Sequence, residues 1–130
     1  MEQVIRFYRV KDWVKSLGFC ALGLTSVEFT LTSNPFLFFL GMIQAFFLFS
    51  FLFSFNDYFD HFLEKEENFI GELIEKSVLS KEKAIFLCTL PLILSLIPLF
   101  SNLSYNYLTF YLLFVTLSIT YSASKIRLRN

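Results

Sequence analysis

Residues 35–64 read PFLFFLGMIQAFFLFSFLFSFNDYFDHFLE, an apolar run that ends abruptly in acidic side chains. Up to residue 55 its only polar side chains are Gln44, Ser50 and Ser54. Because an α-helix rises about 1.5 Å per residue, a run of roughly twenty apolar residues matches the ~30 Å hydrocarbon core of a bilayer. The run therefore predicts a membrane-spanning helix, and the acids that follow it are expected at the membrane surface.

The whole chain has the composition of a membrane protein. Of its 130 residues, 55% are hydrophobic and 17% are charged, whereas soluble domains usually carry about 25% charged residues. We therefore expect an all-α integral membrane protein that forms a single transmembrane domain over residues 1–130. An acidic loop is expected at about residues 56–83, and four spans at about residues 14–30, 35–55, 84–100 and 105–122.

The basic residues follow a one-sided pattern. All of them lie before or at the start of the first span, between the second and third spans, or after the fourth. The two other connections, residues 31–34 and 101–104, carry no charge. Lys and Arg accumulate in the cytoplasmic segments of multi-pass proteins. This pattern predicts a multi-pass protein of the cell membrane with both termini and the acidic loop in the cytoplasm.

The polar residues just after residue 55 have helical spacing. If the second helix continues past residue 55, Asn56, Asp57, Asp60 and Glu64 share one face, because steps of three and four residues return to the same side. Mg²⁺ prefers oxygen ligands and is usually held by one or two carboxylates together with water and phosphate oxygens. Spacing alone leaves two interpretations open for this set, a metal site or a solvated loop. We favour the solvated loop for the acids Glu66, Glu67, Glu72, Glu75 and Glu82.

Some single residues have a structural interpretation beside a functional one. Trp13 and Lys15 have the pattern of an interfacial belt pair, with a phosphate contact as the alternative for Lys15. His61 lies inside the acidic string but points in a different helical direction from Asp60, so we expect it to take no part in a site. Cys88, in the third span, is expected to pack as a small apolar side chain, since free cysteines are commonly buried.

Four strings along the chain match motifs that occur in the same order in one protein family. They are Arg9-Val-Lys-Asp-Trp13-Val14-Lys15, Asn56-Asp57-Tyr58-Phe59-Asp60-His61-Phe62-Leu63-Glu64, residues 68–84, and Tyr121-Ser-Ala-Ser-Lys125. The second string has the pattern N-D-x-x-D-x-x-x-D with Glu64 in the last position, and the fourth has the pattern Y-x-x-x-K. On these motifs the chain resembles the UbiA family of intramembrane prenyltransferases, and it is closest to the branch that acts on polyprenyl phosphates.

The resemblance implies a fold and a site. The fold would be a polytopic transmembrane bundle with four spans, equivalent to the first half of the nine-helix UbiA fold. The implied Mg²⁺ ligands are Asn56, Asp57, Asp60 and Glu64. The implied contacts to a prenyl diphosphate or polyprenyl phosphate are Asn56, Asp57, Lys15 and Lys125. Lys125, positioned by Tyr121, would neutralise the diphosphate as it leaves, so that the implied catalytic residues are Asp60, Glu64, Tyr121 and Lys125.

Together these features predict a Mg²⁺-dependent prenyltransferase that moves a prenyl group from a prenyl diphosphate to an unidentified acceptor within the lipid bilayer. The family has a second Asp-rich motif in its later half, so we expect a second polypeptide to supply that half and the 130-residue chain to be inactive alone. The main alternative is a non-catalytic truncated or split membrane subunit that binds prenyl phosphate or a partner helix bundle. A weaker alternative is a small cation-handling membrane protein with an acidic mouth, and nucleic acid is not an expected partner.

Overall fold

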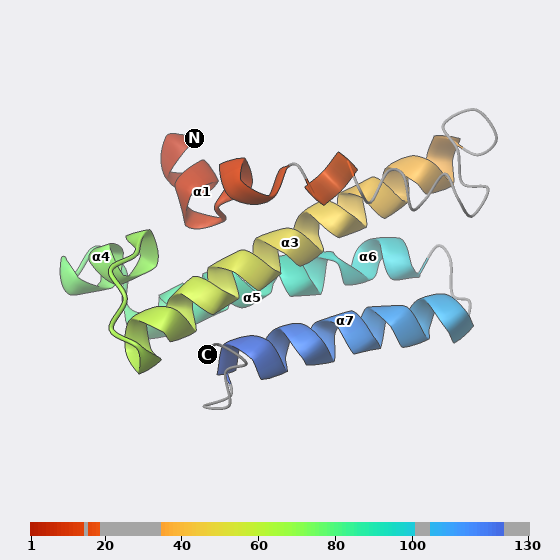
Figure 1. Ribbon diagram of the computed structural model, residues 1–130. Helices are drawn as coiled ribbons and strands as arrows, with labels where there is room; N and C mark the ends of the chain where they lie inside the picture. Colours follow the sequence, from red (N-terminus) through yellow and green to blue (C-terminus); the bar gives the residue numbers. More distant parts are fainter. Residues whose placement is uncertain (15, 19–34, 101–104, 124–130) are drawn as a thin grey trace.

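The computed structural model describes residues 1–14, 16–18, 35–100 and 105–123. Within these ranges the regular elements are all α-helices and no strand forms. The predicted all-α class is therefore confirmed. The helices labelled in Figure 1 are α1 (Glu2–Phe7), α3 (Pro35–Leu63), α4 (Phe69–Glu75), α5 (Lys81–Leu94), α6 (Leu96–Leu99) and α7 (Tyr105–Ala123).

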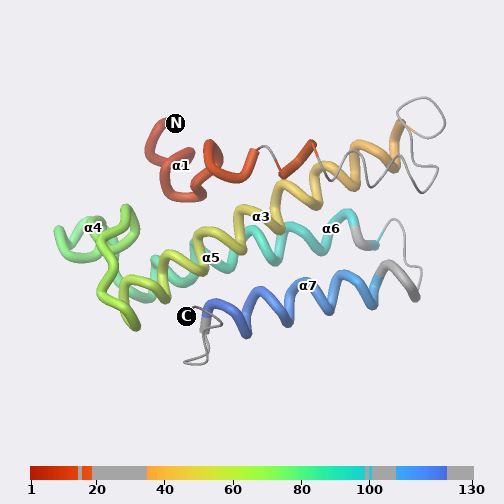
Figure 2. The backbone as a smooth tube through the Cα atoms, viewed as in Figure 1, coloured from red at the N-terminus to blue at the C-terminus, as the bar shows by residue number. Residues whose placement is uncertain are grey.

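Helix α3 is the central element. It contacts α4, α5, α6 and α7, and Figures 1 and 2 show it between the N-terminal segment on one side and α7 on the other, with α5 partly hidden behind it. Among the described helices, α3 alone is long and apolar enough to cross a membrane, and the apolar part of α7, Leu108–Ser122, is shorter. The second predicted span is thus a helix, and it continues past residue 55 to Leu63.

The third predicted span, residues 84–100, is divided into two helices. Helices α5 and α6 meet at Ser95, which lies between two prolines, Pro91 and Pro98. Proline has no backbone N–H and its ring crowds the preceding helical turn, so two prolines seven residues apart prevent one regular helix across this stretch. The third predicted span is therefore interrupted at Ser95, where α5 ends and α6 begins.

Side chains from neighbouring helices bind the polar atoms at this break. Gln44 of α3 donates from Nε2 to the backbone oxygen of Ser95 at 3.1 Å. The hydroxyl of Tyr111, from α7, lies 2.8 Å from Ser95 Oγ. Gln44 is the single amide in the apolar run 35–55, and it is buried at 3% exposure. Its role is explained by this contact, because a buried polar group is costly unless it is hydrogen-bonded.

The remaining predicted spans differ in how much of them the structure describes. The fourth, residues 105–122, coincides with α7. The first, residues 14–30, lies outside the described residues except for residues 14 and 16–18, which are helical. The four-span arrangement therefore stays a prediction.

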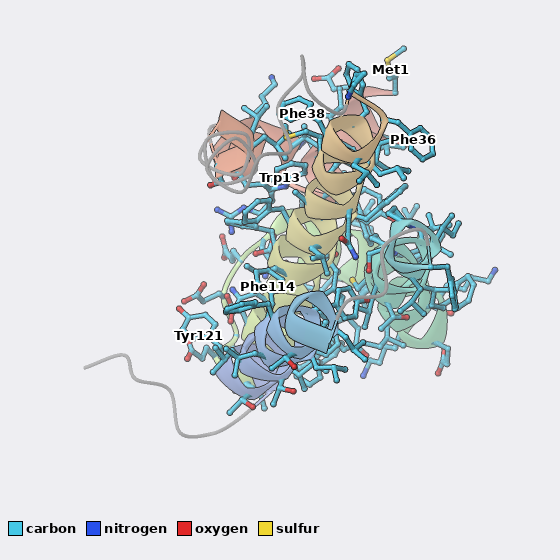
Figure 3. All side chains as sticks on the ribbon, turned by 90° about the vertical axis from the view of Figure 1, so that its right-hand side faces the viewer. Met1, Trp13, Phe36, Phe38, Phe114 and Tyr121 are labelled. Atoms are coloured by element: carbon cyan, nitrogen blue, oxygen red, sulfur yellow. The ribbon has the colours of Figure 1, made fainter. Side chains whose placement is uncertain are left out.

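The N-terminal segment is held on α3 by Trp13. Its ring packs against Phe46 at 5.3 Å and Phe49 at 5.8 Å between centroids, and its Nε1 donates to the backbone oxygen of Tyr8. Figure 3 shows Trp13 between the N-terminal segment and α3. The side chain has 0% exposure, so the predicted interfacial belt role is wrong for Trp13. It is a packing residue that joins two segments of the chain.

Much of the expected acidic loop, residues 56–83, is helical. Helix α3 occupies it up to Leu63, α4 occupies residues 69–75, and α5 begins at residue 81. Ile70 of α4 is fully buried and belongs to the same core as Phe51 and Phe55 of α3. The segment folds because α4 offers apolar side chains that α3 and α5 can cover, and burying a side chain of this size contributes roughly 1.5–3 kcal/mol.

Candidate functional site

The polar residues at the end of α3 line a cavity of about 430 Å³. We call it the polar cavity. Its walls come from the N-terminal segment, the end of α3, the connection to α4 and the last turn of α7, and its lining residues are Arg6, Arg9, Asn56, Asp57, Asp60, Glu66, Glu67, Asn68, Phe69 and Tyr121. Three of the four predicted metal ligands are therefore brought together in one place, as the helical spacing predicted.

Asp57 is paired with a cation from the N-terminal segment, 48 residues earlier in the sequence. Arg9 Nη1 donates to Asp57 Oδ1 at 3.0 Å, while Arg9 Nε binds the carboxylate of Asp12 at 2.7 Å. Asp57 lies two residues past the apolar run 35–55 and is buried at 6% exposure. Burial raises the pKa of its carboxyl above the ordinary value, and Arg9 only partly opposes this shift. Desolvation lowers the pKa of Arg9, but the bonds to Asp12 and Asp57 outweigh it and raise that pKa.

Asp60 and Asn56 form a second pair one helical turn apart. Asn56 Nδ2 donates to Asp60 Oδ2 at 2.6 Å, and Asp60 is buried at 5% exposure. The amide oxygen of Asn56 is also buried and has no hydrogen-bond partner among the described residues. A buried oxygen of this kind is a ready acceptor or metal ligand, since leaving it without a partner costs free energy.

The set of oxygen atoms fits Mg²⁺ in its chemistry. In the described ranges no group of three or more His, Cys, Asp or Glu side chains is arranged to hold a metal ion. Mg²⁺ is usually bound through only one or two carboxylates, with water and phosphate oxygens completing its six ligands. Asp57, Asp60 and Asn56 all line the polar cavity, and their side-chain oxygens are hard donors. The residues therefore fit Mg²⁺ provided that a phosphate group binds with it.

Glu64 does not line the polar cavity, in contrast to the prediction. It lies one residue past the end of α3 and is exposed. Next to it, Lys65 has a φ of 56°, a left-handed conformation that commonly ends a helix and turns the chain. After this turn Glu66 and Glu67 line the cavity, although the sequence favoured solvated roles for them. The Glu64 N–H still donates to the backbone oxygen of Asp60 at 3.0 Å, so Glu64 completes the last turn of α3, and its role as a metal ligand stays a prediction.

Asn68 is a site residue that the sequence analysis missed. Its Nδ2 donates to the backbone oxygen of Asp57 at 2.8 Å, and its Oδ1 accepts from the Gly71 amide at 2.9 Å. It is thus the N-cap of α4, and its hydrogen bond to Asp57 connects α4 to the site. The signal was present in the sequence, because Asn is a preferred N-cap residue and an apolar helical stretch follows it.

His61 has a structural role in the packing of α3 against α4. Its ring packs so closely on Gly71 of α4 that a Cβ at that glycine would overlap it. It is not among the residues that line the polar cavity, and with Phe62 and Glu75 it lines a depression that adjoins this cavity. The close approach of α3 and α4 therefore requires a residue without a side chain at position 71.

A second, apolar cavity of about 470 Å³ adjoins the first. We call it the apolar cavity. It is lined by side chains of α3 and α7 together with Arg9: Arg9, Leu52, Phe53, Asn56, Phe114, Leu117, Ser118 and Tyr121. Figure 3 shows Phe114 and Tyr121 projecting from the same side of α7. Arg9, Asn56 and Tyr121 line both cavities, so a ligand could place one end in each.

The predicted site residues thus fall into three groups. Asn56, Asp57, Asp60 and Tyr121 line the polar cavity, and Glu64 does not. Lys15 and Lys125 lie outside the described residues, and so do the contacts predicted for them. The position of Tyr121 is notable because it comes from α7, some sixty residues after the acidic motif, yet reaches the same cavity.

Comparisons with known proteins identify no relative of this chain: no protein-family model matches it, and no curated protein or solved structure gives a significant match.

Proposed function

We propose that this chain binds a prenyl diphosphate at the membrane surface and belongs to a Mg²⁺-dependent prenyltransferase of the UbiA type. The observation that carries the proposal is the pair of adjoining cavities, one charged and one apolar, that share Arg9, Asn56 and Tyr121. A prenyl diphosphate is a molecule with a charged head and a hydrocarbon tail. The polar cavity suits the diphosphate and the apolar cavity suits the first part of the tail.

The proposed setting is a four-span bundle in the cell membrane. Helix α3 is long and apolar enough to cross a bilayer, and large apolar side chains are exposed along α5, α6 and α7, such as Phe86, Ile97 and Phe110. In water such faces would be unfavourable, but in lipid they are solvated by hydrocarbon. Both termini and residues 56–83 are proposed to lie on the cytoplasmic side, as the positions of the basic residues indicate.

The roles proposed for the residues follow from their chemistry. Asp57, Asp60 and Asn56 would hold Mg²⁺, and bound Mg²⁺ would supply positive charge that stabilises a leaving diphosphate. Lys15 and Lys125 are proposed as further phosphate contacts, with Tyr121 at the boundary between head and tail. The rings of Phe53 and Phe114 would exclude water from the reacting carbon, and their faces favour positive charge that develops there.

The second acidic set of the family is proposed to come from a C-terminal half, on this or on a second polypeptide. The alternative proposal is a non-catalytic membrane subunit that binds a prenyl phosphate. Both place a prenyl ligand with a phosphate or diphosphate head in the same two cavities. They differ in whether transfer follows binding when a C-terminal half is present.

Binding measurements on the purified chain in lipid nanodiscs test the proposal. We expect geranylgeranyl diphosphate to bind only with Mg²⁺ present, and Asp60→Asn to weaken binding by more than roughly tenfold, which corresponds to ~1.4 kcal/mol. Glu82→Gln is the matched control, because Glu82 is exposed at the start of α5 and lines neither cavity. Equal effects from the two substitutions, or binding that ignores Mg²⁺, would exclude the metal–diphosphate site.

A further inference from the structure

Arg9 occupies the boundary between the two cavities. Its guanidinium binds Asp57 and Asp12 at the same time, and it lies 5.4 Å from the centroid of the Phe53 ring. It lines both the polar and the apolar cavity. Arg9 is therefore positioned where the charged head of a ligand would meet its tail.

The backbone at Arg9 is fixed in an unusual conformation. Its φ is 49°, in the left-handed region that residues with a Cβ seldom adopt. This turn separates α1 from the helical residues 10–14, and Trp13 anchors these residues on α3 through its ring contacts with Phe46 and Phe49. The conformation is thus maintained by packing, and it directs the side chain across to α3.

Arg9 and a metal ion compete for the same carboxylate. Asp57 is buried, and the guanidinium is the cation that faces it at 3.0 Å. A divalent cation bound to Asp57 would place a second positive charge beside the guanidinium at a buried carboxylate, which is unfavourable. A diphosphate removes this conflict, because guanidinium groups bind phosphate oxygens through two parallel hydrogen bonds.

We infer that Arg9 is an exchangeable counter-ion that makes the site selective for a metal–diphosphate complex over a free metal ion. In the ligand-free chain it neutralises Asp57. When a metal–diphosphate enters the polar cavity, the guanidinium leaves Asp57 and binds a phosphate oxygen. This inference rests on the proposed function, and it adds a specificity-determining residue that the predicted ligand set did not include.

The test compares two probes on the full chain in nanodiscs. The first is Mn²⁺ alone, detected by electron paramagnetic resonance, and the second is a diphosphate with Mg²⁺, either inorganic diphosphate or geranylgeranyl diphosphate. Arg9→Gln should tighten Mn²⁺ binding by about fivefold, because the competing cation is gone, and weaken both diphosphates by about tenfold. Lys11→Gln, which removes an exposed cation two residues away, should change each value by less than about twofold.

Opposite changes for the two probes are the required result. A variant that loses affinity for both probes, or for neither, would show that Arg9 is only a structural residue and would overturn the inference. If affinity falls for geranylgeranyl diphosphate but not for inorganic diphosphate, Arg9 contacts the hydrocarbon tail and not the diphosphate. That result would also overturn the inference. If Arg9→Gln does not fold, Arg9→Lys takes its place, and it must weaken diphosphate binding while leaving Mn²⁺ binding within about twofold. A wild-type chain that binds neither diphosphate would instead reject the proposed function, and this inference with it.

Discussion

At the scale of single residues, Asp57 is held through both its side chain and its backbone. Arg9 pairs with the carboxylate, and Asn68 donates to the backbone oxygen. The shared cavity of Asn56, Asp57 and Asp60 could be predicted from the sequence because helical spacing is a local property. The partners could not, because Arg9 comes from a segment 48 residues away and no local pattern states which distant group will meet a buried acid.

Asn68 offers a test of how the site is supported. Asn68→Ala removes both the N-cap of α4 and the bond to Asp57, and losing an N-cap side chain costs about 0.5–2 kcal/mol. We therefore expect the free energy of unfolding, measured by denaturant titration in detergent micelles, to fall by roughly 1–2 kcal/mol. Diphosphate binding should weaken as well, because α4 carries part of the cavity wall.

Asn68→Ser separates the two contributions. A serine can cap α4 but is too short to donate to the Asp57 backbone oxygen as the amide does. It should recover most of the stability lost in the alanine variant while recovering less of the binding. An alanine variant as stable as the wild type would mean that this cap does not hold α4 in place.

At the scale of the helices, the proline in α5 leaves one backbone oxygen without its usual helical donor, and another segment supplies that donor. Pro91 cannot donate to the backbone oxygen of Leu87, one turn earlier, and the hydroxyl of Tyr8 donates to that oxygen at 3.0 Å. The sequence contains both prolines, so the break between α5 and α6 has a local cause. It did not predict Tyr8 as the donor, nor Gln44 as the donor at Ser95, because both depend on how separate helices pack.

A double-mutant cycle tests the link between Tyr8 and Pro91. Tyr8→Phe should destabilise the protein by about 0.6 kcal/mol and at most about 1.7 kcal/mol, the range measured for hydrogen bonds in a membrane protein. In the Pro91→Ala background the backbone N–H of the new alanine can bind Leu87 instead. Tyr8→Phe should then have a clearly smaller effect on thermal stability in detergent. An undiminished effect in that background would show that Tyr8 does not compensate for the proline.

At the scale of the whole molecule, the elements of the site gather at one end of the bundle. Figure 1 shows α1, α4, the last turns of α3 and the last turns of α7 toward the same end. The basic residues lie in or next to these segments in the sequence. The charge pattern and the arrangement of the helices therefore both indicate one polar end of the bundle. The sequence predicted the helical class and the bounds of α7. The docking of the N-terminal segment required three-dimensional packing.

Cysteine labelling in intact cells tests the proposed orientation. In a background without Cys20 and Cys88, a cysteine at Glu67 should be protected from a membrane-impermeant thiol reagent, and one at Asn102 should be modified. The physical reason is that basic segments stay in the cytoplasm while the uncharged connections cross to the other side. Permeabilised cells provide the control, since both positions should then react. The reverse pattern in intact cells would contradict the orientation.

The burial of Trp13 gives the protein an optical property. Trp13 is the only tryptophan in the chain, so indole fluorescence arises from one place, the contact between the N-terminal segment and α3. An indole in an apolar setting emits at shorter wavelength than one in water, and the rings of Phe46 and Phe49 provide such a setting. Because Trp13 lies four residues after Arg9, the colour of this emission reports directly, without any added dye, whether the segment that carries Arg9 is docked.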